Sequence, residues 1–335
     1  MPISRRSLLA AAASAPLAGL LRQTLAAPAA QGVYVAVGYG GRRMMSRDGL
    51  AWDAVQQWTD KNADDSNNLI SVAFGKGKFV AVGGGGFSKE TQAGHVLVSA
   101  DGKDWREVKK YPFRVSPVVF AADRFVAGGP SRQLLWSDDG EAWTEGPAVP
   151  LPKEIPSWAF WFRHGAAGIV GGKPAYVFVG NANKDQKTWW CLTSRDGKAV
   201  ASFATDLPKV AGIAFGAGRF VIASPEGLRT SPDGQKWEAP ADGPQDDFRG
   251  VVWTGTAFYA TGKQQAYTSP DGRKWSPAGK APGAHVLWAD ERVMIGSGWP
   301  GKMSASTDGG KTWKPTGQPM PGLGVNAVAY GVPGK

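Results

Sequence analysis

Cysteine and histidine are scarce in this chain of 335 residues, which has one cysteine and three histidines. A single cysteine excludes an intramolecular disulfide, and the run Trp189-Trp190-Cys191-Leu192 is typical of a buried strand rather than of a reactive thiol. His95, His164 and His285 lack the close spacing of a zinc site. We therefore expect no structural or catalytic transition metal and no cofactor.

Long apolar runs are also missing, apart from one near the start of the sequence. Ser4-Arg5-Arg6-Ser7-Leu8-Leu9 is a twin-arginine phrase, followed by an Ala-rich apolar stretch and by small residues at Ala27-Pro28-Ala29 that suit a signal peptidase. We predict a twin-arginine signal peptide over residues 1–30 and export of the chain, to the periplasm or as a secreted protein. The alternative is a retained membrane anchor, for which the stretch is short and is interrupted by Arg22. No integral membrane span is expected after cleavage.

Acidic residues are outnumbered by basic ones, and the formal net charge is +10. Arg5, Arg6 and Arg22 belong to the predicted signal peptide, and the remaining positive charge is spread along the sequence instead of forming one basic patch. This pattern argues against nucleic-acid binding. It is compatible with an anionic partner such as a polysaccharide, a lipid headgroup or an acidic protein.

A phrase that starts Ser-x-Asp-Gly occurs seven times, five of them as Ser-x-Asp-Gly-x-x-Trp, in a chain with 46 glycines. The copies start 37 to 57 residues apart, which is about the length of one four-stranded propeller blade plus occasional insertions. They begin at Ser46, Ser99, Ser137, Ser194, Ser231, Ser269 and Ser306. We predict a single domain over residues 31–335, an all-β, seven-bladed β-propeller with 28 strands.

Each phrase is explained as a tight turn without a ligand. The carboxylate accepts hydrogen bonds from nearby N–H groups, the glycine tolerates a positive φ, and the terminal indole fixes the turn to its own blade. Seven aspartates are therefore expected to be structural: Asp48, Asp101, Asp139, Asp196, Asp233, Asp271 and Asp308. The fourth copy reaches Val200 where the Trp should stand, so its blade is expected to be the loosest.

The phrase resembles the Asp-box, or bacterial neuraminidase, repeat of sialidases, sortilin-type receptors, some glucanases and the photosystem II stability/assembly factor family. The copy from Ser306 to Trp313 matches the full pattern, and five others are one residue shorter between Asp and Trp. The resemblance implies a sialidase-like β-propeller. It does not imply one function, because this repeat serves enzymes and non-enzymes.

The strand order can be read from one unit and the ring closure from the two ends of the domain. Leu69 to Gly75 is expected to be an inner strand, and Lys78 to Gly83 the second strand of the same blade. Val33 to Gly38 matches a second strand, whereas Asn326 to Gly331 matches an inner one. The C-terminal strand should therefore complete the first blade and remove the exposed edges.

The same order separates two faces. The repeat turns share one face with the connections between first and second strands, and the irregular loops lie on the other, where binding groups concentrate. Aromatic planes beside charged groups suit sugars, so we expect ligand contacts from this set: Trp58, Trp158, Trp161, Trp189, Trp299, Arg114 and Arg249. The stretch from Ile155 to Arg163 is either an inner strand with an enlarged turn or an insertion on the loop face.

Two functions fit these residues. We favour a non-catalytic, monomeric binding or assembly module with a glycan or an extracytoplasmic protein as partner. The alternative is a sialidase-like glycosidase, or another hydrolase or lyase, in which Arg114, Arg163 and Arg249 hold a substrate carboxylate. Its acid would come from Asp60, Asp64 or Asp65. However, Phe113-Arg114-Val115-Ser116 matches the family's Phe-Arg-Ile-Pro phrase only in part, and no Tyr and Glu pair is evident.

Overall fold

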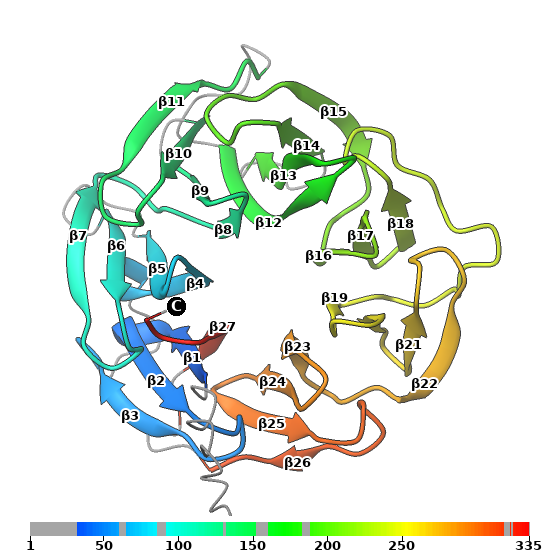
Figure 1. The fold of residues 1–335 in the computed structure, drawn as a ribbon. Coiled ribbons are helices and arrows are strands. Elements are labelled where there is room, and N and C mark those ends of the chain that lie inside the picture. The colour runs from blue at the N-terminus through cyan, green and yellow to red at the C-terminus, as the bar shows by residue number, and fades with distance from the viewer. Residues whose placement is uncertain are drawn as a thin grey trace, which may run out of the picture. The chain divides into compact units, whose positions relative to one another are not determined.

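Seven antiparallel sheets stand around a central axis in the computed structural model of the protein (Figure 1). The structure describes residues 32–59, 65–85, 92–129, 132–151, 160–182, 188–317, 322 and 324–334. The predicted signal peptide lies outside these residues, and Gly32–Lys335 forms a compact unit separate from Met1–Gln31. The expected all-β, seven-bladed propeller is confirmed.

The blades follow one another along the chain, and within each blade the strands succeed one another from the axis outward. Blade 1 contains β27 (Val325–Gly331), β1 (Val33–Gly38), β2 (Arg42–Ser46) and β3 (Asp53–Gln56). Blade 2 contains β4 (Leu69–Gly75), β5 (Lys78–Gly85), β6 (Ala93–Ser99) and β7 (Arg106–Tyr111). Blade 3 contains β8 (Val118–Ala121), β9 (Arg124–Gly128), β10 (Gln133–Ser137) and β11 (Thr144–Ala148).

The other four blades repeat this order. Blade 4 contains β12 (Phe160–Val170), β13 (Lys173–Ala182), β14 (Trp189–Ser194) and β15 (Ser202–Leu207). Blade 5 contains β16 (Gly212–Gly216), β17 (Arg219–Ser224) and β18 (Gly227–Ser231). Blade 6 contains β19 (Gly250–Trp253), β20 (Phe258–Thr261), β21 (Gln265–Ser269) and β22 (Ser276–Lys280). Blade 7 contains β23 (His285–Ala289), β24 (Met294–Gly298), β25 (Lys302–Ser306) and β26 (Lys314–Pro315).

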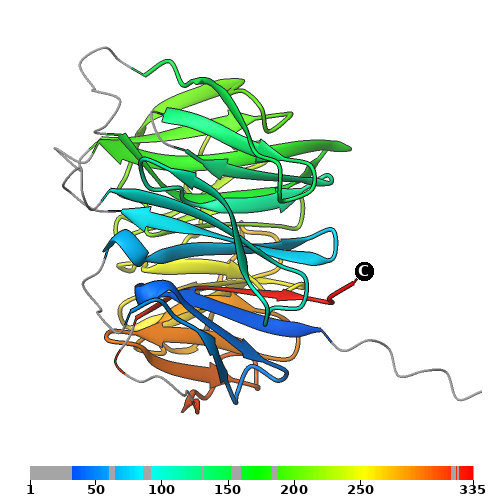
Figure 2. The ribbon, with the colours of Figure 1, turned by 90° about the vertical axis from the view of Figure 1, so that its left-hand side faces the viewer.

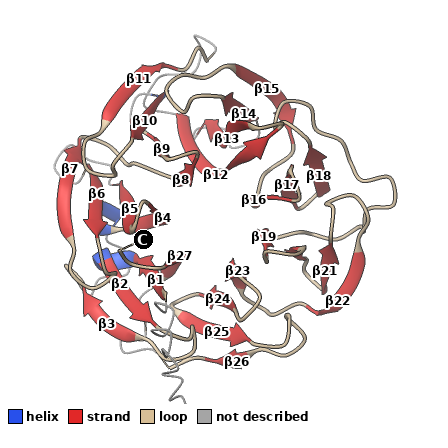
Figure 3. Ribbon diagram, in the orientation of Figure 1, coloured by secondary structure: helices blue, strands red, loops and turns tan. Residues whose placement is uncertain are grey.

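Helix is confined to two short 3-10 turns in the described residues, η1 (Tyr39–Gly41) and η2 (Asp65–Asn67), as Figure 3 shows. They contact each other beside β4, at the joint between blades 1 and 2. Within the part of the chain that the structure describes, no helix has the length and apolar character needed to cross a membrane.

The C-terminal strand closes the ring as expected. β27 pairs antiparallel with β1, with Val35 opposite Ala329, and forms the innermost strand of blade 1. Its residues Val325, Val328 and Ala329 are buried. Because Val328 packs with blade 7 and Ala329 with blade 2, β27 joins three blades.

Blade 5 departs from the expected four strands. The described residues contain 27 strands and not 28, because the outer strand of this blade is reduced to one bridge between Thr230 and Glu238. Both hydrogen bonds of that bridge form, at 2.8 and 3.0 Å. Pro240 follows two residues later, and a proline has no N–H to extend the ladder.

The inner strand of blade 4 lies further along the chain than the sequence indicated. β12 runs from Phe160 to Val170 and turns tightly at Gly171 and Gly172 into β13. The expected enlarged turn is therefore wrong. The additional residues precede β12, in the connection from blade 3, and residues 152–159 of that connection lie outside the described residues.

The repeat turns have the hydrogen bonds that their chemistry demands. In the second copy, Asp101 Oδ1 accepts from the N–H groups of Lys103 and Asp104 at 2.8 Å, and Ser99 Oγ accepts from Gly102 N at 2.8 Å. The other copies share this arrangement, from Ser46 and Asp48 onward. The seven aspartates therefore hold backbone turns.

Each turn also packs against the preceding blade, which the sequence did not reveal. A Cβ added to Gly102 of blade 2 would lie 2.7 Å from Val35 of blade 1, and one on Gly140 of blade 3 would lie 2.9 Å from Val80 of blade 2.

The core consists of seven clusters, each shared by two successive blades. The turn Trp of the later blade packs in six of them: Trp52, Trp105, Trp143, Trp237, Trp275 and Trp313. The turns thus join neighbouring blades and do not act only within their own.

The joint between blades 3 and 4 has Val200 in place of the Trp, and other contacts reinforce it. Arg124 of blade 3 donates to the carbonyl of Asp196 in the fourth turn at 2.6 Å. Trp136 lies under two cations, with Arg124 Cζ at 4.8 Å and Lys198 Nζ at 4.6 Å from the ring centroid. We call Trp136, Arg124 and Lys198 the Trp136 cluster. Whether blade 4 is the loosest stays a prediction.

Candidate binding face

The two faces of the ring carry different connections. The repeat face carries the seven Ser-x-Asp-Gly turns, and the loop face carries the connections between blades and between second and third strands, including the described residues 39–41, 57–59, 65–68, 112–117 and 299–301. Figure 2 shows the ring edge-on, with the strands running between the two faces. Most residues expected to bind a ligand lie on the loop face.

Trp161 lies between two arginines at the loop-face end of β12. The guanidinium carbons of Arg114 and Arg163 lie 4.5 and 4.9 Å from its ring centroid. Arg114 Nε donates to the carbonyl of Gly84 at 2.9 Å, and Arg163 Nε donates to Asn181 Oδ1 at 2.8 Å. Each arginine is therefore positioned by a hydrogen bond as well as by the indole. We call Trp161, Arg114 and Arg163 the Trp161 cluster.

The surroundings of the Trp161 cluster lower the pKa values of both of its arginines. Burial lowers the pKa of Arg114, against the effect of the nearby Asp65 carboxylate, which favours the protonated form. Burial also lowers the pKa of Arg163, and repulsion by Arg114 lowers it further. A negative ligand charge at this place would relieve both effects.

Trp58 forms a second aromatic site, nearer blades 1 and 2. Its ring is 40% exposed and lies 4.8 Å from Arg43 Cζ and 4.8 Å from the imidazole of His95. The backbone N–H of Trp58 donates to the carbonyl of Gly40 in η1 at 2.8 Å. Trp58 thus presents one surface to solvent above two basic side chains.

Trp299 is the most exposed large apolar residue in the described structure, at 66%. Its indole meets the Tyr39 ring edge-on, with centroids 5.6 Å apart. Tyr39 belongs to η1, as does Gly41, whose Cα faces the Trp58 ring. Two exposed indoles therefore flank η1.

Sequence reasoning missed two arginines on this face. Arg42 and Arg43 begin β2 directly after η1, and their side chains are buried. Burial lowers the pKa of each to about 10. Both arginines follow the glycine-rich connection between the second and third strands of blade 1. This position in the sequence would have assigned them to the loop face.

The structure separates other predicted site residues from these clusters. Arg249 directly precedes β19 at the start of blade 6, where its carbonyl oxygen lies 3.3 Å from His285 Nδ1. Arg114 precedes β8 of blade 3, and Arg163 lies within β12 of blade 4, so the three arginines come from three different blades. Trp189 is only 5% exposed and packs in the core between blades 4 and 5, so we leave it out of the proposed site. Asp65 begins η2 near Arg114, whereas Asp60, Asp64 and Trp158 lie outside the described residues.

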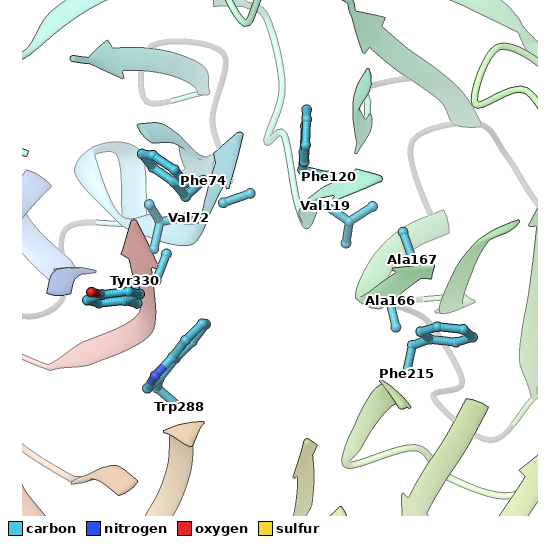
Figure 4. A pocket seen from close by; sticks show the side chains of 11 residues that line it. Val72, Phe74, Val119, Phe120, Ala166, Ala167, Phe215, Trp288 and Tyr330 are labelled. Carbon is cyan, nitrogen blue, oxygen red and sulfur yellow. The ribbon is translucent and has the colours of Figure 1, made fainter. Parts of the chain in front are cut away.

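The axis of the ring contains an open cavity of about 290 Å³ (Figure 4). Its lining residues are Val, Ala, Phe, Trp and Tyr side chains of β4, β8, β12, β16, β23 and β27, and none is acidic or basic. Several of the aromatic rings rest on glycines of the preceding blade, such as Phe120 on Gly75 and Phe215 on Gly168. The described lining residues stand in the middle or later parts of the inner strands, toward the repeat face, so this cavity is distinct from the Trp161 cluster at the loop-face end of β12.

Cys191 is buried in β14, as its neighbours in the sequence indicated. Burial raises the pKa of its thiol to about 12, and Sγ donates to the carbonyl of Gly234 at 3.2 Å. Among the residues that the structure describes, no three His, Cys, Asp or Glu side chains form a group that could hold a metal ion.

Fold and site together define a seven-bladed β-propeller with a basic, aromatic loop face. No protein-family model matches the chain, and no curated protein matches it. Among solved structures it is similar to the GH74 xyloglucanase from Xanthomonas campestris, with a TM-score of 0.56 and 16% identity over 90% of this chain and 52% of that one. It is also similar to YCF48 from Cyanidioschyzon merolae, with a TM-score of 0.53 and 15% identity over 82% and 90% of the two chains.

A third similar structure is YCF48 bound to a D1 peptide, with a TM-score of 0.50 and 15% identity over 74% of this chain and 81% of that one. At such identities the likeness establishes the propeller fold alone. These proteins include a hydrolase and a peptide-binding propeller, so function has to be argued from the loop face.

Proposed function

We propose that this protein is an exported, non-catalytic binding or assembly module that holds an anionic partner on its loop face. The Trp161 cluster carries the proposal, because two guanidinium groups lie over one indole where burial disfavours the charge of both and Arg114 also repels Arg163. Export is proposed from the twin-arginine phrase at residues 4–9, and the monomeric state is proposed from the closed ring.

A carboxylate is the ligand group that suits this geometry. Guanidinium groups bind carboxylates through paired, charge-assisted hydrogen bonds, and such bonds are stronger when partly shielded from water. The indole of Trp161 adds a flat apolar surface beside the charges. An acidic peptide or a glycan with carboxylate groups would satisfy both features.

Two observations bear on the class of partner. Exposed Trp58 and Trp299 supply planes on which pyranose rings stack, which supports a glycan. YCF48, a propeller similar to this chain, is known in a complex with a peptide, which supports a protein partner. Either partner would have to be negatively charged, and the binding test distinguishes an acidic peptide from an acidic glycan.

A sialidase-like glycosidase is the alternative function. It would need three arginines on one substrate carboxylate, supplied from three different blades, whereas the contacts described above bring together only Arg114 and Arg163. None of the described residues that line the axial cavity is acidic. Release of sugar from sialosides or other glycosides, lost in Arg114→Gln, would overturn the non-catalytic proposal.

The binding test compares two matched cations that stack on tryptophans of opposite faces. Arg114→Gln removes one from the Trp161 cluster, and Lys198→Gln removes one from the Trp136 cluster. Calorimetric titration with poly-aspartate and with polygalacturonate should show binding that weakens about tenfold or more in Arg114→Gln, the loss of one charge-assisted contact. Lys198→Gln and neutral dextran serve as controls. Equal affinity of both variants, or no binding of either acidic polymer, would contradict the proposal.

A further inference from the structure

The inner strands repeat one position close to their turns into the second strands, on the repeat face. Pairing with the second strand defines this position, as in Phe74 opposite Phe79. In blade 4 the residue at this position, opposite Tyr176, is Ala167. In the other six blades, taken in order from blade 1, the residue is aromatic: Tyr330, Phe74, Phe120, Phe215, Trp253 and Trp288.

The surface on which such an aromatic ring rests also differs at blade 4. At four other joints the ring rests on a glycine of the preceding blade: Phe74 on Gly331, Phe120 on Gly75, Phe215 on Gly168 and Trp253 on Gly216. At the joint between blades 3 and 4 the equivalent residue is Ala121, opposite Arg124 as Gly75 is opposite Lys78. The place that an aromatic ring takes at those joints therefore has only the methyl groups of Ala121 and Ala167.

The axial cavity extends to this place. Ala166 and Ala167 line it between Phe120 and Phe215, as Figure 4 shows, and its volume is about 290 Å³. An apolar cavity of about 150 Å³ is large enough to bind benzene. The axial cavity therefore has room for a compound of two fused rings.

The polar atoms of the aromatic lining residues are bound within the protein. Trp288 Nε1 donates to Asp290 Oδ2 at 3.4 Å. The hydroxyl oxygen of Tyr330 accepts from the N–H of Gly32 and from Arg292, both at 3.2 Å. A charged ligand would lose its hydration here without gaining a charged side-chain partner from the described lining residues, so the cavity favours a neutral ligand.

We propose that the axial cavity binds a neutral, flat aromatic compound, whose ring takes the place at Ala167 that an aromatic side chain takes in the other blades. Aromatic rings attract one another at centroid distances of about 4.5–7 Å. Phe120 and Phe215 already pair in this way with Phe125 and Phe220, each at 4.7 Å. This site lies toward the repeat face and does not depend on anion binding at the loop face.

NMR of alanine methyl groups tests the site with 2-naphthol as the probe. The resonances of Ala166 and Ala167, assigned with Ala166→Ser and Ala167→Ser, should shift saturably, with a Kd of about 1 mM or lower. The resonance of Ala305, a buried residue of β25 outside the cavity lining, should stay constant. Decahydro-2-naphthol, which has the same carbon skeleton without aromatic rings, should bind at least about fivefold more weakly.

A variant that fills the place tests it from the protein side. Ala167→Phe combined with Ala121→Gly gives this joint the same pair of residues as Phe120 and Gly75. It should weaken 2-naphthol binding, read from Ala166, about tenfold or more. Ala121→Gly alone is the matched control and should bind like the native protein.

Two further variants separate loss of the site from loss of the fold and from the loop face. Phe215→Leu removes an aromatic wall without filling the place and should weaken binding about threefold, while an unchanged Ala305 resonance shows that each variant is folded. Arg114→Gln should bind 2-naphthol like the native protein. The absence of saturable shifts at Ala166 and Ala167, or native affinity in the filled variant, would overturn the proposal. Equal binding of decahydro-2-naphthol would overturn the aromatic class of ligand.

Discussion

Two tryptophans of this ring each stack under two cations, one on each face. On the repeat face, Trp136 lies beneath Arg124 and Lys198, and on the loop face Trp161 lies beneath Arg114 and Arg163. The distances are almost the same, from 4.5 to 4.9 Å. The two clusters differ in how the protein environment acts on their charge.

Around Trp136 the charge has close acidic and backbone partners. Arg124 Nε lies 2.6 Å from Asp138 Oδ1, and this hydrogen bond raises the pKa of Arg124. Around Trp161 the pKa values of both arginines are lowered, mainly by burial. A cluster whose charge is favoured stabilises a joint between blades, whereas one whose charge is disfavoured by burial gains from an incoming anion. The same motif thus has a structural role on one face and, as we propose, a binding role on the other.

Removal of residues 324–335 should have the largest effect on both faces. The deletion removes β27, which completes blade 1 and contributes buried residues to the clusters with blades 2 and 7. We expect loss of cooperative thermal unfolding, because an opened ring exposes unpaired strand edges. A truncated protein that melts within about two degrees of the full chain, where 1 kcal/mol corresponds to a few degrees, would contradict the closure of the ring.

Replacement of each tryptophan by alanine should separate stability from binding. Trp136→Ala should lower the free energy of unfolding by about 3 kcal/mol, because Trp136 packs against the core between blades 3 and 4. Trp161→Ala should cost less stability and should weaken binding of poly-aspartate about tenfold. Urea unfolding and calorimetric titration measure the two effects. If Trp136→Ala weakened binding and Trp161→Ala lost the greater stability, the distinction between the faces would be contradicted.

Gly102→Ala should test whether the repeat turns join successive blades. Gly102 has a φ of +80°, and a Cβ there would lie 2.7 Å from Val35 of the preceding blade. We expect a loss of about 2 kcal/mol, from backbone strain and overpacking together. Gly218→Ala is the control, since Gly218 has a φ of +70° with open space around its Cβ. Equal losses in the two variants would mean that the contact with the preceding blade contributes nothing.

Acid should weaken repeat turns whose aspartate has a lowered pKa, such as the first turn. The N–H of Ala51 donates to Asp48, as does that of Leu50, and these hydrogen bonds hold the pKa of Asp48 below its usual value against the opposing effect of burial. A depressed pKa in the folded state adds stability that is present above the unfolded pKa and is lost as pH falls through the folded one. Asp48→Asn should therefore flatten the decline in urea stability between about pH 5 and about pH 2, and an unchanged slope would contradict this role.

The repeated parts of the molecule could be predicted closely from the sequence. Leu69–Gly75 is the inner strand of blade 2 as expected, and Ser99 and Asp101 hold their turn as expected, because turn chemistry and period are local properties. Contacts between blades were not predicted, since the packing of Gly102 on Val35 depends on the radius and twist of the ring.

The loop face could be predicted only in part. The strand order identified it, but the convergence of Trp58, His95 and Glu107 depends on how irregular connections fold. Side-chain direction was also hidden: Trp161 faces two arginines, whereas Trp189 enters the core. Irregular segments lack the periodicity that assigns a residue to one side of a strand.

Hydrogen exchange of the protein with and without bound poly-aspartate tests the difference between the faces most directly. If the loop face binds anions, protection should appear in peptides that contain Arg114 and Trp161, while the fourth repeat turn around Asp196 and Lys198 exchanges as in the free protein. Protection confined to the repeat turns, with peptides around Arg114 and Trp161 unchanged, would contradict the assignment of binding to the loop face.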